Sequence, residues 1–161
     1  MNFSNLFLRF EGRIGRGSWW LAALVLVIAA IVLTFIVYAL LGVGWATAGL
    51  STSATLGSIV VTALIAYPAT AVMIKRLNDR DRPTWMAAVF WAPTVLLLLG
   101  QLLGLTVSMQ DVGGIVVPAP TPLGWVINIV AFAVGVWGLI ELGILRGTSG
   151  PNRHGPDPVA G

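Results

Sequence analysis

The chain has no cysteine and only one histidine in 161 residues. Without cysteine it can form no disulfide bond, offer no thiolate ligand to a metal and use no cysteine nucleophile. Zinc sites take three or four ligands that are mostly Cys or His, so His154 with Asp157 nearby is too small a set. We therefore expect neither a metal nor any other cofactor.

Charged residues are also scarce, at 9% of the chain compared with about 25% in a typical soluble domain. Hydrophobic residues make up 57%, and the mean hydropathy is +0.91. This composition is typical of an integral membrane protein. In a soluble domain, a net charge of +3 and an isoelectric point near 10.2 would suggest nucleic acid as a partner. With so few charges their placement matters more than their sum, and we expect no nucleic-acid partner.

Long apolar runs are what the chain has in abundance. A helix needs about 20 apolar residues to cross a hydrocarbon core about 30 Å thick. The connectors between the runs are rich in Gly, Ser, Thr and Pro, as interfacial turns usually are. The pattern predicts an all-α fold, a four-helix transmembrane bundle that forms a single membrane domain over residues 1–161. Its expected spans are residues 19–41, 54–74, 85–107 and 123–145.

The basic residues all fall on one side of this four-span arrangement. They precede the first span, lie between the second and third, or follow the fourth, whereas connectors 42–53 and 108–122 carry only Asp111. Short loops rich in Lys and Arg stay in the cytoplasm. We therefore expect both termini and the loop 75–83 to be cytoplasmic in a multi-pass protein. The nine residues are Arg9, Arg13, Arg16, Lys75, Arg76, Arg80, Arg82, Arg146 and Arg153.

The two terminal segments have patterns of their own. Apolar residues from Phe3 to Ile14 recur at spacings of three and four, which predicts an amphipathic helix lying on the membrane surface within residues 1–18. At the other end, Gly147 to Pro158 contains three prolines and three glycines in twelve residues. That composition excludes a helix and favours successive turns. We expect residues 146–161 to form an ordered, turn-rich cytoplasmic tail.

Three stretches carry a resemblance to a known family: FEGRIGRGSWW (residues 10–20), IKRLNDRDRPTW (74–85) and LRGTSGPNRHGPDP (145–158). In order and spacing they look like the boxes of the domain of unknown function 805 (DUF805) family, the YhaH-like small bacterial inner-membrane proteins. The resemblance implies the fold, the inner (plasma) membrane and the orientation, but no reaction. Asn78 stands where the family pattern usually has His, so a metal or proton role at that position is doubtful.

All three boxes should emerge on the cytoplasmic face, where their polar side chains can converge. In one interpretation, Asp79 and Asp157 pair with the arginines, and the tail caps the bundle. Arg13 and Arg16 would share a face if both were helical. In the other, the cluster binds an anion, either a phospholipid headgroup or the acidic surface of a protein partner. The candidate residues are Arg13, Arg16, Lys75, Arg76, Asn78, Asp79, Asn152, Arg153 and Asp157.

Glu141 is the one ionisable residue inside an expected span. Such residues are costly in lipid and often functional. Because it lies one to two turns from the cytoplasmic end, it can reach headgroup water or pair with Arg146, Arg16 or Arg76. If it faces the bundle interior instead, a path for protons or cations becomes possible.

The sequence contains no phosphate-binding loop, no nucleophile triad and no metal-ligand cluster. We therefore expect a non-enzymatic inner-membrane protein whose basic cytoplasmic face interacts with anionic lipid or a protein partner. The alternative is a subunit of an oligomeric transporter or channel that uses Glu141. A lipid-modifying enzyme using Asp79, Asp157 or His154 is a third, weaker interpretation. A homo-oligomer is compatible with the first two.

Overall fold

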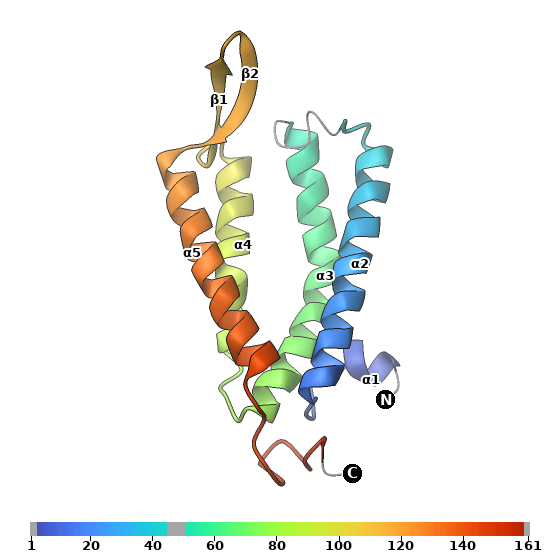
Figure 1. Cartoon of the computed structure of the whole chain (residues 1–161). Coiled ribbons are helices and arrows are strands. Elements are labelled where there is room, and N and C mark those ends of the chain that lie inside the picture. The colour runs from blue at the N-terminus through green and yellow to red at the C-terminus, as the bar shows by residue number, and fades with distance from the viewer. Residues whose placement is uncertain (1–2, 45–50, 160–161) are drawn as a thin grey trace.

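The computed structural model describes residues 3–44 and 51–159, which form a mostly helical fold with one small β-hairpin (Figure 1). Apolar residues dominate the long helices, and a shorter π-helical segment completes the last of them. The elements in chain order are α1 (Phe3–Phe7), α2 (Arg16–Leu40), α3 (Thr52–Asp79), α4 (Met86–Leu102), β1 (Val107–Val112), β2 (Ile115–Pro120), α5 (Pro122–Gly138) and η2 (Leu139–Ile144).

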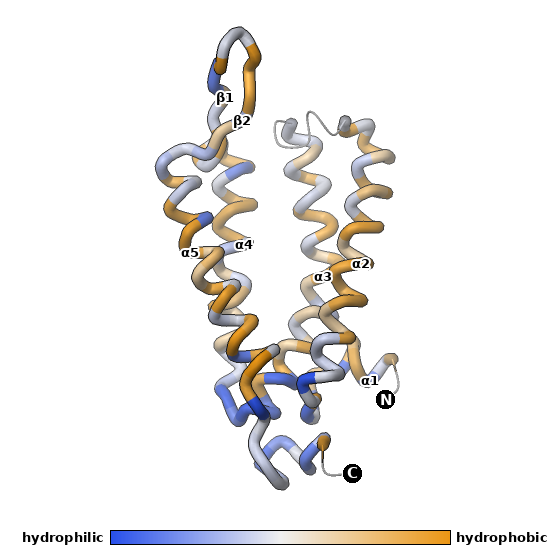
Figure 2. The backbone as a smooth tube through the Cα atoms, in the orientation of Figure 1, coloured by the Kyte–Doolittle hydropathy of each residue, from blue (hydrophilic) through white to orange (hydrophobic). Residues whose placement is uncertain are grey.

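The long helices form two antiparallel pairs, α2 with α3 and α4 with α5 (Figure 1). The pairs lie close together near the chain termini and diverge toward the β-hairpin, so that the molecule has the shape of a V. Hydrophilic residues gather where the pairs meet, and the helices above are mainly hydrophobic (Figure 2). We call the closed end, with residues 12–16, 75–86 and 141–158, the basic end. The open end, with β1 and β2, is the hairpin end.

Three helical segments in the described part of the chain are long and apolar enough to cross a membrane: α2, α3 and the continuous α5–η2 segment of 23 residues. The expected third span, residues 85–107, is shorter than predicted, because α4 has only 17 residues. Gly104, with a φ of +68°, follows α4, and the Leu105 amide bonds back to the Gly100 carbonyl at 2.7 Å. This turn ends the helix before the strand begins.

The predicted helical membrane fold is confirmed in its main part, but the connector after α4 is a β-hairpin where only turns were expected at residues 108–122. Strands β1 and β2 pair antiparallel, with Val112 opposite Ile115. Gly113 and Gly114 have φ values of +67° and +86°, the backbone that a two-residue hairpin turn requires. The Asp111 carboxylate accepts a 2.7 Å hydrogen bond from the Gly114 amide and closes the turn.

The predicted amphipathic helix over Phe3 to Ile14 was also wrong beyond its first turn, because α1 ends at Phe7. The following residues form a loop that packs on α3, with the Phe10 ring 5.1 Å from the Tyr67 ring. Gly12 has a φ of +87°, which a continuing helix cannot accommodate. Ile14 is 1% exposed, so the apolar residue expected to face lipid lies in the protein core.

The buried core lies toward the basic end, where the two helical pairs meet. Gly143 allows the close contact of η2 with α2, since a Cβ atom there would lie 2.9 Å from ring atoms of both Trp19 and Trp20. Elsewhere most large apolar side chains are exposed, as expected for surfaces that face lipid. The core residues are Phe7, Ile14, Trp19, Ala22, Val72, Leu77, Met86, Ala87 and Leu142.

Two glycines of α5 predict opposite effects of the same substitution. A Cβ atom at Gly124 would lie 2.2 Å from the Thr106 carbonyl oxygen, whereas one at Gly135 meets nothing within 4 Å. We expect Gly124→Ala to lower the free energy of unfolding by about 1–3 kcal/mol, because backbone must shift. Gly135→Ala should raise it by about 0.5–1 kcal/mol through helix propensity. Thermal unfolding in detergent measures both, and equal shifts would contradict the close contact at Gly124.

Candidate functional site

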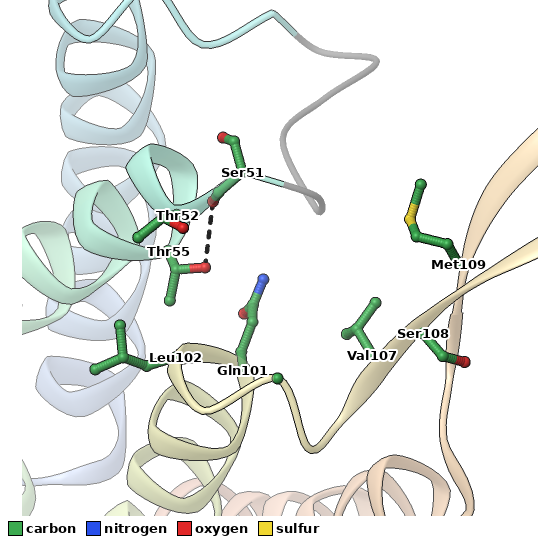
Figure 3. A pocket seen from close by; sticks show the side chains of 9 residues that line it. Ser51, Thr52, Thr55, Gln101, Leu102, Val107, Ser108 and Met109 are labelled. Atoms are coloured by element: carbon green, nitrogen blue, oxygen red, sulfur yellow. Dashed lines mark hydrogen bonds between the residues drawn. The ribbon is translucent and has the colours of Figure 1, made fainter.

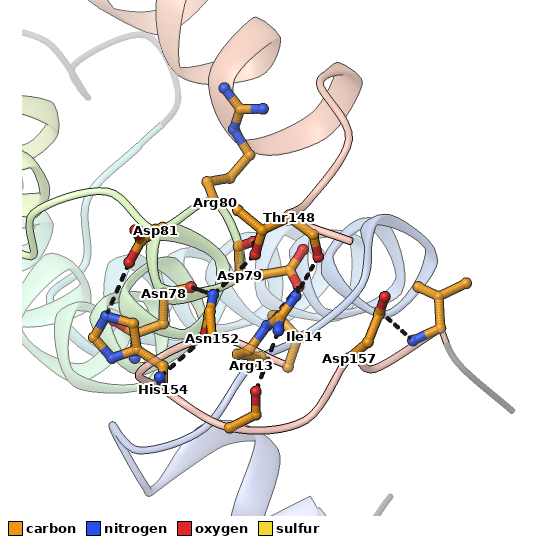
Figure 4. Close-up of polar contacts among 12 residues, drawn as sticks. Arg13, Ile14, Asn78, Asp79, Arg80, Asp81, Thr148, Asn152, His154 and Asp157 are labelled. Carbon is orange, nitrogen blue, oxygen red and sulfur yellow. Dashed lines mark hydrogen bonds and ion pairs between the residues drawn. The ribbon is translucent and has the colours of Figure 1, made fainter. Parts of the chain in front are cut away.

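Asp79, the last residue of α3, lies at the centre of a polar network at the basic end (Figure 4). Its side chain is only 3% exposed. One carboxylate oxygen accepts from Nε of Arg13 at 3.1 Å, and the other accepts from Nη1 of Arg76. The Asp79 carbonyl accepts from the backbone amide of Thr148 at 2.8 Å. The residue thus joins the N-terminal segment, its own helix and the tail.

Arg13 connects the same carboxylate to the tail. Its guanidinium donates to the carbonyls of Thr148 at 2.7 Å, Gly150 at 2.8 Å and Gly155 at 3.2 Å. With the side chain 1% exposed, these bonds occupy the fixed fork of donors that arginine presents. Arg13 and Arg16 do not share a helical face, because α2 begins at Arg16 and Arg13 precedes it.

Arg76 is completely buried, and backbone carbonyls surround it. It donates to the carbonyls of Leu142 at 2.6 Å and Leu145 at 2.5 Å, at the end of η2, and to that of Ile14 at 3.4 Å. A helix end leaves its last carbonyls without partners within the helix, and Arg76 supplies donors to them. With Asp79 as its counter-charge, the buried guanidinium has both an ion pair and hydrogen bonds.

Glu141 lies in the π-helical segment η2 and is 5% exposed. One carboxylate oxygen accepts from Nη2 of Arg80 at 3.0 Å and from Nε of Arg82 at 2.9 Å. Glu141 is ion-paired, as one interpretation expected, but the expected partners Arg146, Arg16 and Arg76 were wrong. The loop between α3 and α4 supplies the actual partners.

Asn78 and Asn152 fasten the tail to the end of α3. The side-chain amide of Asn78 donates to the Gly12 backbone carbonyl at 3.1 Å. The backbone carbonyl of Asn78 accepts from the side-chain amide of Asn152 at 3.0 Å. The Asn152 side-chain oxygen accepts from the His154 backbone amide at 2.9 Å, which closes a turn (Figure 4). Up to Val159, where the described residues end, the tail consists of turns and bends.

Asp157 was expected to pair with the arginines, but it accepts backbone hydrogen bonds instead. They come from Gly150 at 3.0 Å and Val159 at 2.9 Å, and they hold the pKa of Asp157 below its usual value. A lowered pKa favours the ionised form. The two bonds are therefore complete above about pH 4 and are lost as the pH falls through the lowered pKa.

Lys75 and Arg153 have separate local partners. Lys75 is 2% exposed and donates to two backbone carbonyls near the end of α1, that of Asn5 and that of Leu6, the latter at 2.7 Å. These carbonyls thereby gain hydrogen-bond partners that the short helix does not provide. Arg153 is largely exposed and pairs with Asp81 at 2.8 Å. Neither side chain contributes to the central network around Asp79.

A hollow of about 370 Å³ lies beside this network, between the start of α2 and the tail. Arg16 and Arg146 border it, together with Thr148 and Ser149. Arg16 donates to the Ile144 carbonyl at 3.1 Å. The exposed side chain of Arg146 makes no hydrogen bond or ion pair within residues 3–44 and 51–159. Sequence reasoning left Arg146 out of the candidate site, although its position just after the last span was a signal.

The described residues contain no group of three or more Asp, Glu or His side chains placed to hold a metal ion. The network is made of arginines whose charges are met by two carboxylates and by backbone carbonyls. Such an arrangement fixes one packing of the basic end and provides no free general base or nucleophile among these side chains. Chemically, it can hold segments together and attract anions at its rim.

The buried ion pairs predict a large difference between two neighbouring aspartates. Asp79→Asn leaves Arg13 and Arg76 buried with no carboxylate, and we expect the free energy of unfolding to fall by about 3–5 kcal/mol. Asp81→Asn is the matched control, since the exposed pair with Arg153 is worth about 0–1 kcal/mol. Thermal unfolding in detergent measures both. Similar small losses would mean that the network around Asp79 does not stabilise the fold.

The comparisons with known proteins agree with this picture of a membrane protein. The family described as "Protein of unknown function (DUF805)" matches residues 7–156, which include nearly all of the network. Two curated relatives are similar, each described as "Inner membrane protein YhaH", from Escherichia coli K12 and from E. coli O157:H7. Each is 28% identical over 156 residues, covering 94% of this chain and 88% of the relative. No solved structure matches. Because the match covers most of its length, the chain belongs to the DUF805 family of membrane proteins.

Proposed function

We propose that this is a non-enzymatic protein of the bacterial inner membrane that binds anionic phospholipid headgroups at its basic end. The observation that carries the proposal is the hollow bordered by Arg16 and Arg146. These two cations lie at the rim of a network in which the other arginines are mostly paired with Asp79 or Glu141. The protein spans the membrane with four helices in this proposal, α4 being the short one.

The orientation follows from the distribution of charge. All nine Lys and Arg residues belong to the basic end or to the N-terminal segment packed on it, whereas the connector with the β-hairpin carries only Asp111. The positive-inside rule then puts the basic end, both termini and loop 75–83 in the cytoplasm. The hollow would face the leaflet that is rich in anionic lipid on that side.

Arg13 and Arg76 are poor candidates for lipid capture, although the sequence singles them out. Both are buried and bonded to Asp79 and to backbone carbonyls. Arg16 and Arg146 are exposed and keep donors that a phosphate oxygen can use. Asp79 and Asp157 also line the hollow, but their oxygens already accept hydrogen bonds, which reduces their repulsion of an anion.

The pairing of Glu141 argues against the transporter or channel alternative. A proton or cation path through this carboxylate would have to displace two arginines, Arg80 and Arg82, from the same oxygen. The pairing is better explained as a bond between η2 and the loop after α3. We therefore keep lipid binding as the proposed function and the protein partner as an outcome of its test.

We expect the double substitution Arg16→Ala, Arg146→Ala to weaken binding of phosphatidylglycerol about 30-fold, since each basic residue near an anionic surface contributes about 1 kcal/mol. The measurement is native mass spectrometry of lipids retained on the purified full chain, with phosphatidylglycerol added in steps. High salt should reduce the difference, because the attraction is electrostatic.

The matched control is Arg153→Ala, which removes an exposed arginine of the tail that pairs with Asp81 outside the hollow. It should leave phosphatidylglycerol binding nearly unchanged. Equal binding by the wild type and the double variant would overturn the proposal. If a second protein accompanies the purified wild type but not the double variant, and lipid binding is unchanged, a protein partner would be favoured instead.

A further inference from the structure

The space between the two helical pairs contains an apolar groove of about 280 Å³ near the point where they meet. Every long helix contributes to it: Trp19 from α2, Met73 from α3, Phe90 from α4 and Gly135 from α5. No charged side chain lines it, and Thr94 carries the only hydroxyl group among its lining side chains. The groove lies within the segments proposed to span the membrane, so hydrocarbon surrounds its opening.

Small residues on α5 make room for this groove. A side chain at Gly135 would extend into open space, because its Cβ atom meets nothing within 4 Å. One turn later, Gly138 faces the Phe90 ring, and a Cβ atom there would lie 3.3 Å from the nearest ring carbon. Ridges of small residues usually let a neighbouring helix approach closely. At Gly135, the described residues leave that space unfilled.

A second hollow, of about 260 Å³, lies at the hairpin end between the start of α3 and the end of α4 (Figure 3). Its polar groups are hydroxyls and one amide, contributed by Ser51, Thr52, Thr55, Ser108 and Gln101. The Gln101 side chain points into the space between α3 and the β-hairpin, and its amide makes no hydrogen bond within the described part of the chain. None of the described residues that line this hollow is charged.

The two hollows are separated by about one membrane leaflet. Gln101 and Phe90 are eleven residues apart on α4, which is about 16 Å along a helix. Half of a hydrocarbon core about 30 Å thick is about 15 Å. The hydroxyl and amide groups therefore lie at the depth of the headgroup region. The apolar groove extends from Thr94 to Phe90 on α4, about 10–16 Å deeper, where the distal part of an acyl chain from that leaflet ends.

We propose that the cleft between the helical pairs binds a single lipid from the leaflet at the hairpin end. One acyl chain fills the groove beside Gly135, and the amide of Gln101 donates to an ester carbonyl or hydroxyl group of the glycerol and headgroup region. Because no charge lines either hollow, this site favours no anionic headgroup. Its polar part lies at the hairpin end, in the opposite leaflet from Arg16 and Arg146, and its apolar part reaches toward the core at the junction of the pairs.

A transmembrane helix of a second copy is a poorer fit to this groove. A helix with its side chains is about 10–12 Å across, which is much wider than a single lipid chain. The groove offers about 280 Å³, which suits a narrower chain. A lipid chain is also the group that the surrounding bilayer supplies at this depth.

The test uses the full chain in phosphatidylethanolamine vesicles that contain a small fraction of a phospholipid with a diazirine in one acyl chain. After illumination, peptide mass spectrometry should find the label on residues 90–94 and 131–138. Gly135→Leu fills the groove and displaces several methylene groups, so labelling of these segments should fall about tenfold or more. Ala133→Leu, on the exposed side of the same helix, is the matched control and should leave labelling unchanged.

Gln101→Leu tests the polar hollow while leaving the groove open. It should lower labelling of the same segments severalfold, whereas Arg16→Ala, Arg146→Ala should not change it, which separates this site from the basic end. Thermal unfolding checks that each variant is folded. Equal labelling in wild type, Gly135→Leu and Ala133→Leu would overturn the proposal. So would cross-linked dimers of the chain in place of lipid adducts at residues 131–138.

Discussion

The fold depends on the burial of the Asp79 carboxylate between Arg13 and Arg76. An isolated charge in such a place would cost several kcal/mol, so each of the three groups is stable there only with the others. The two arginines also donate to carbonyls of the tail and of η2. A single carboxylate therefore determines where the first residues, the second long helix and the last residues of the chain meet.

The molecule therefore has two regions that are held together by different kinds of interaction. At the basic end, hydrogen bonds and ion pairs hold four separate segments, and packing of Trp19 against Gly143 closes the junction. Toward the hairpin end the described backbone of the two pairs diverges (Figure 1), and each pair is held by its own helix contacts. The hollow beside Arg16 and Arg146 belongs to the first region, whereas the second candidate lipid site extends from the hollow at the hairpin end to the apolar groove near the junction.

The sequence predicted the parts of this structure that depend on composition and periodicity. Long apolar runs require helices in a membrane, and the family boxes indicated that the polar residues meet at one end. The hairpin turn was missed although Gly113-Gly114 between β-branched residues is a known signal. The end of α1 and the partners of Glu141 could not be predicted, because both depend on neighbours in space. The loop of Arg80 and Arg82 lies next to η2 only after the helical pairs have docked.

The connections of Arg76 also imply an order of assembly during synthesis. Residues 13, 76 and 79 leave the ribosome long before Leu142 of η2 and Leu145 just after it, whose carbonyls Arg76 needs as partners. Until those residues arrive, a nascent chain with only α2 and α3 carries a guanidinium at the membrane surface with part of its hydrogen bonding left to water. The first helical pair can thus insert early, but water leaves the surroundings of Arg76 only after η2 and the residues that follow it have emerged. Closure of the basic end therefore depends on the docking of a segment that is synthesised long after its partners.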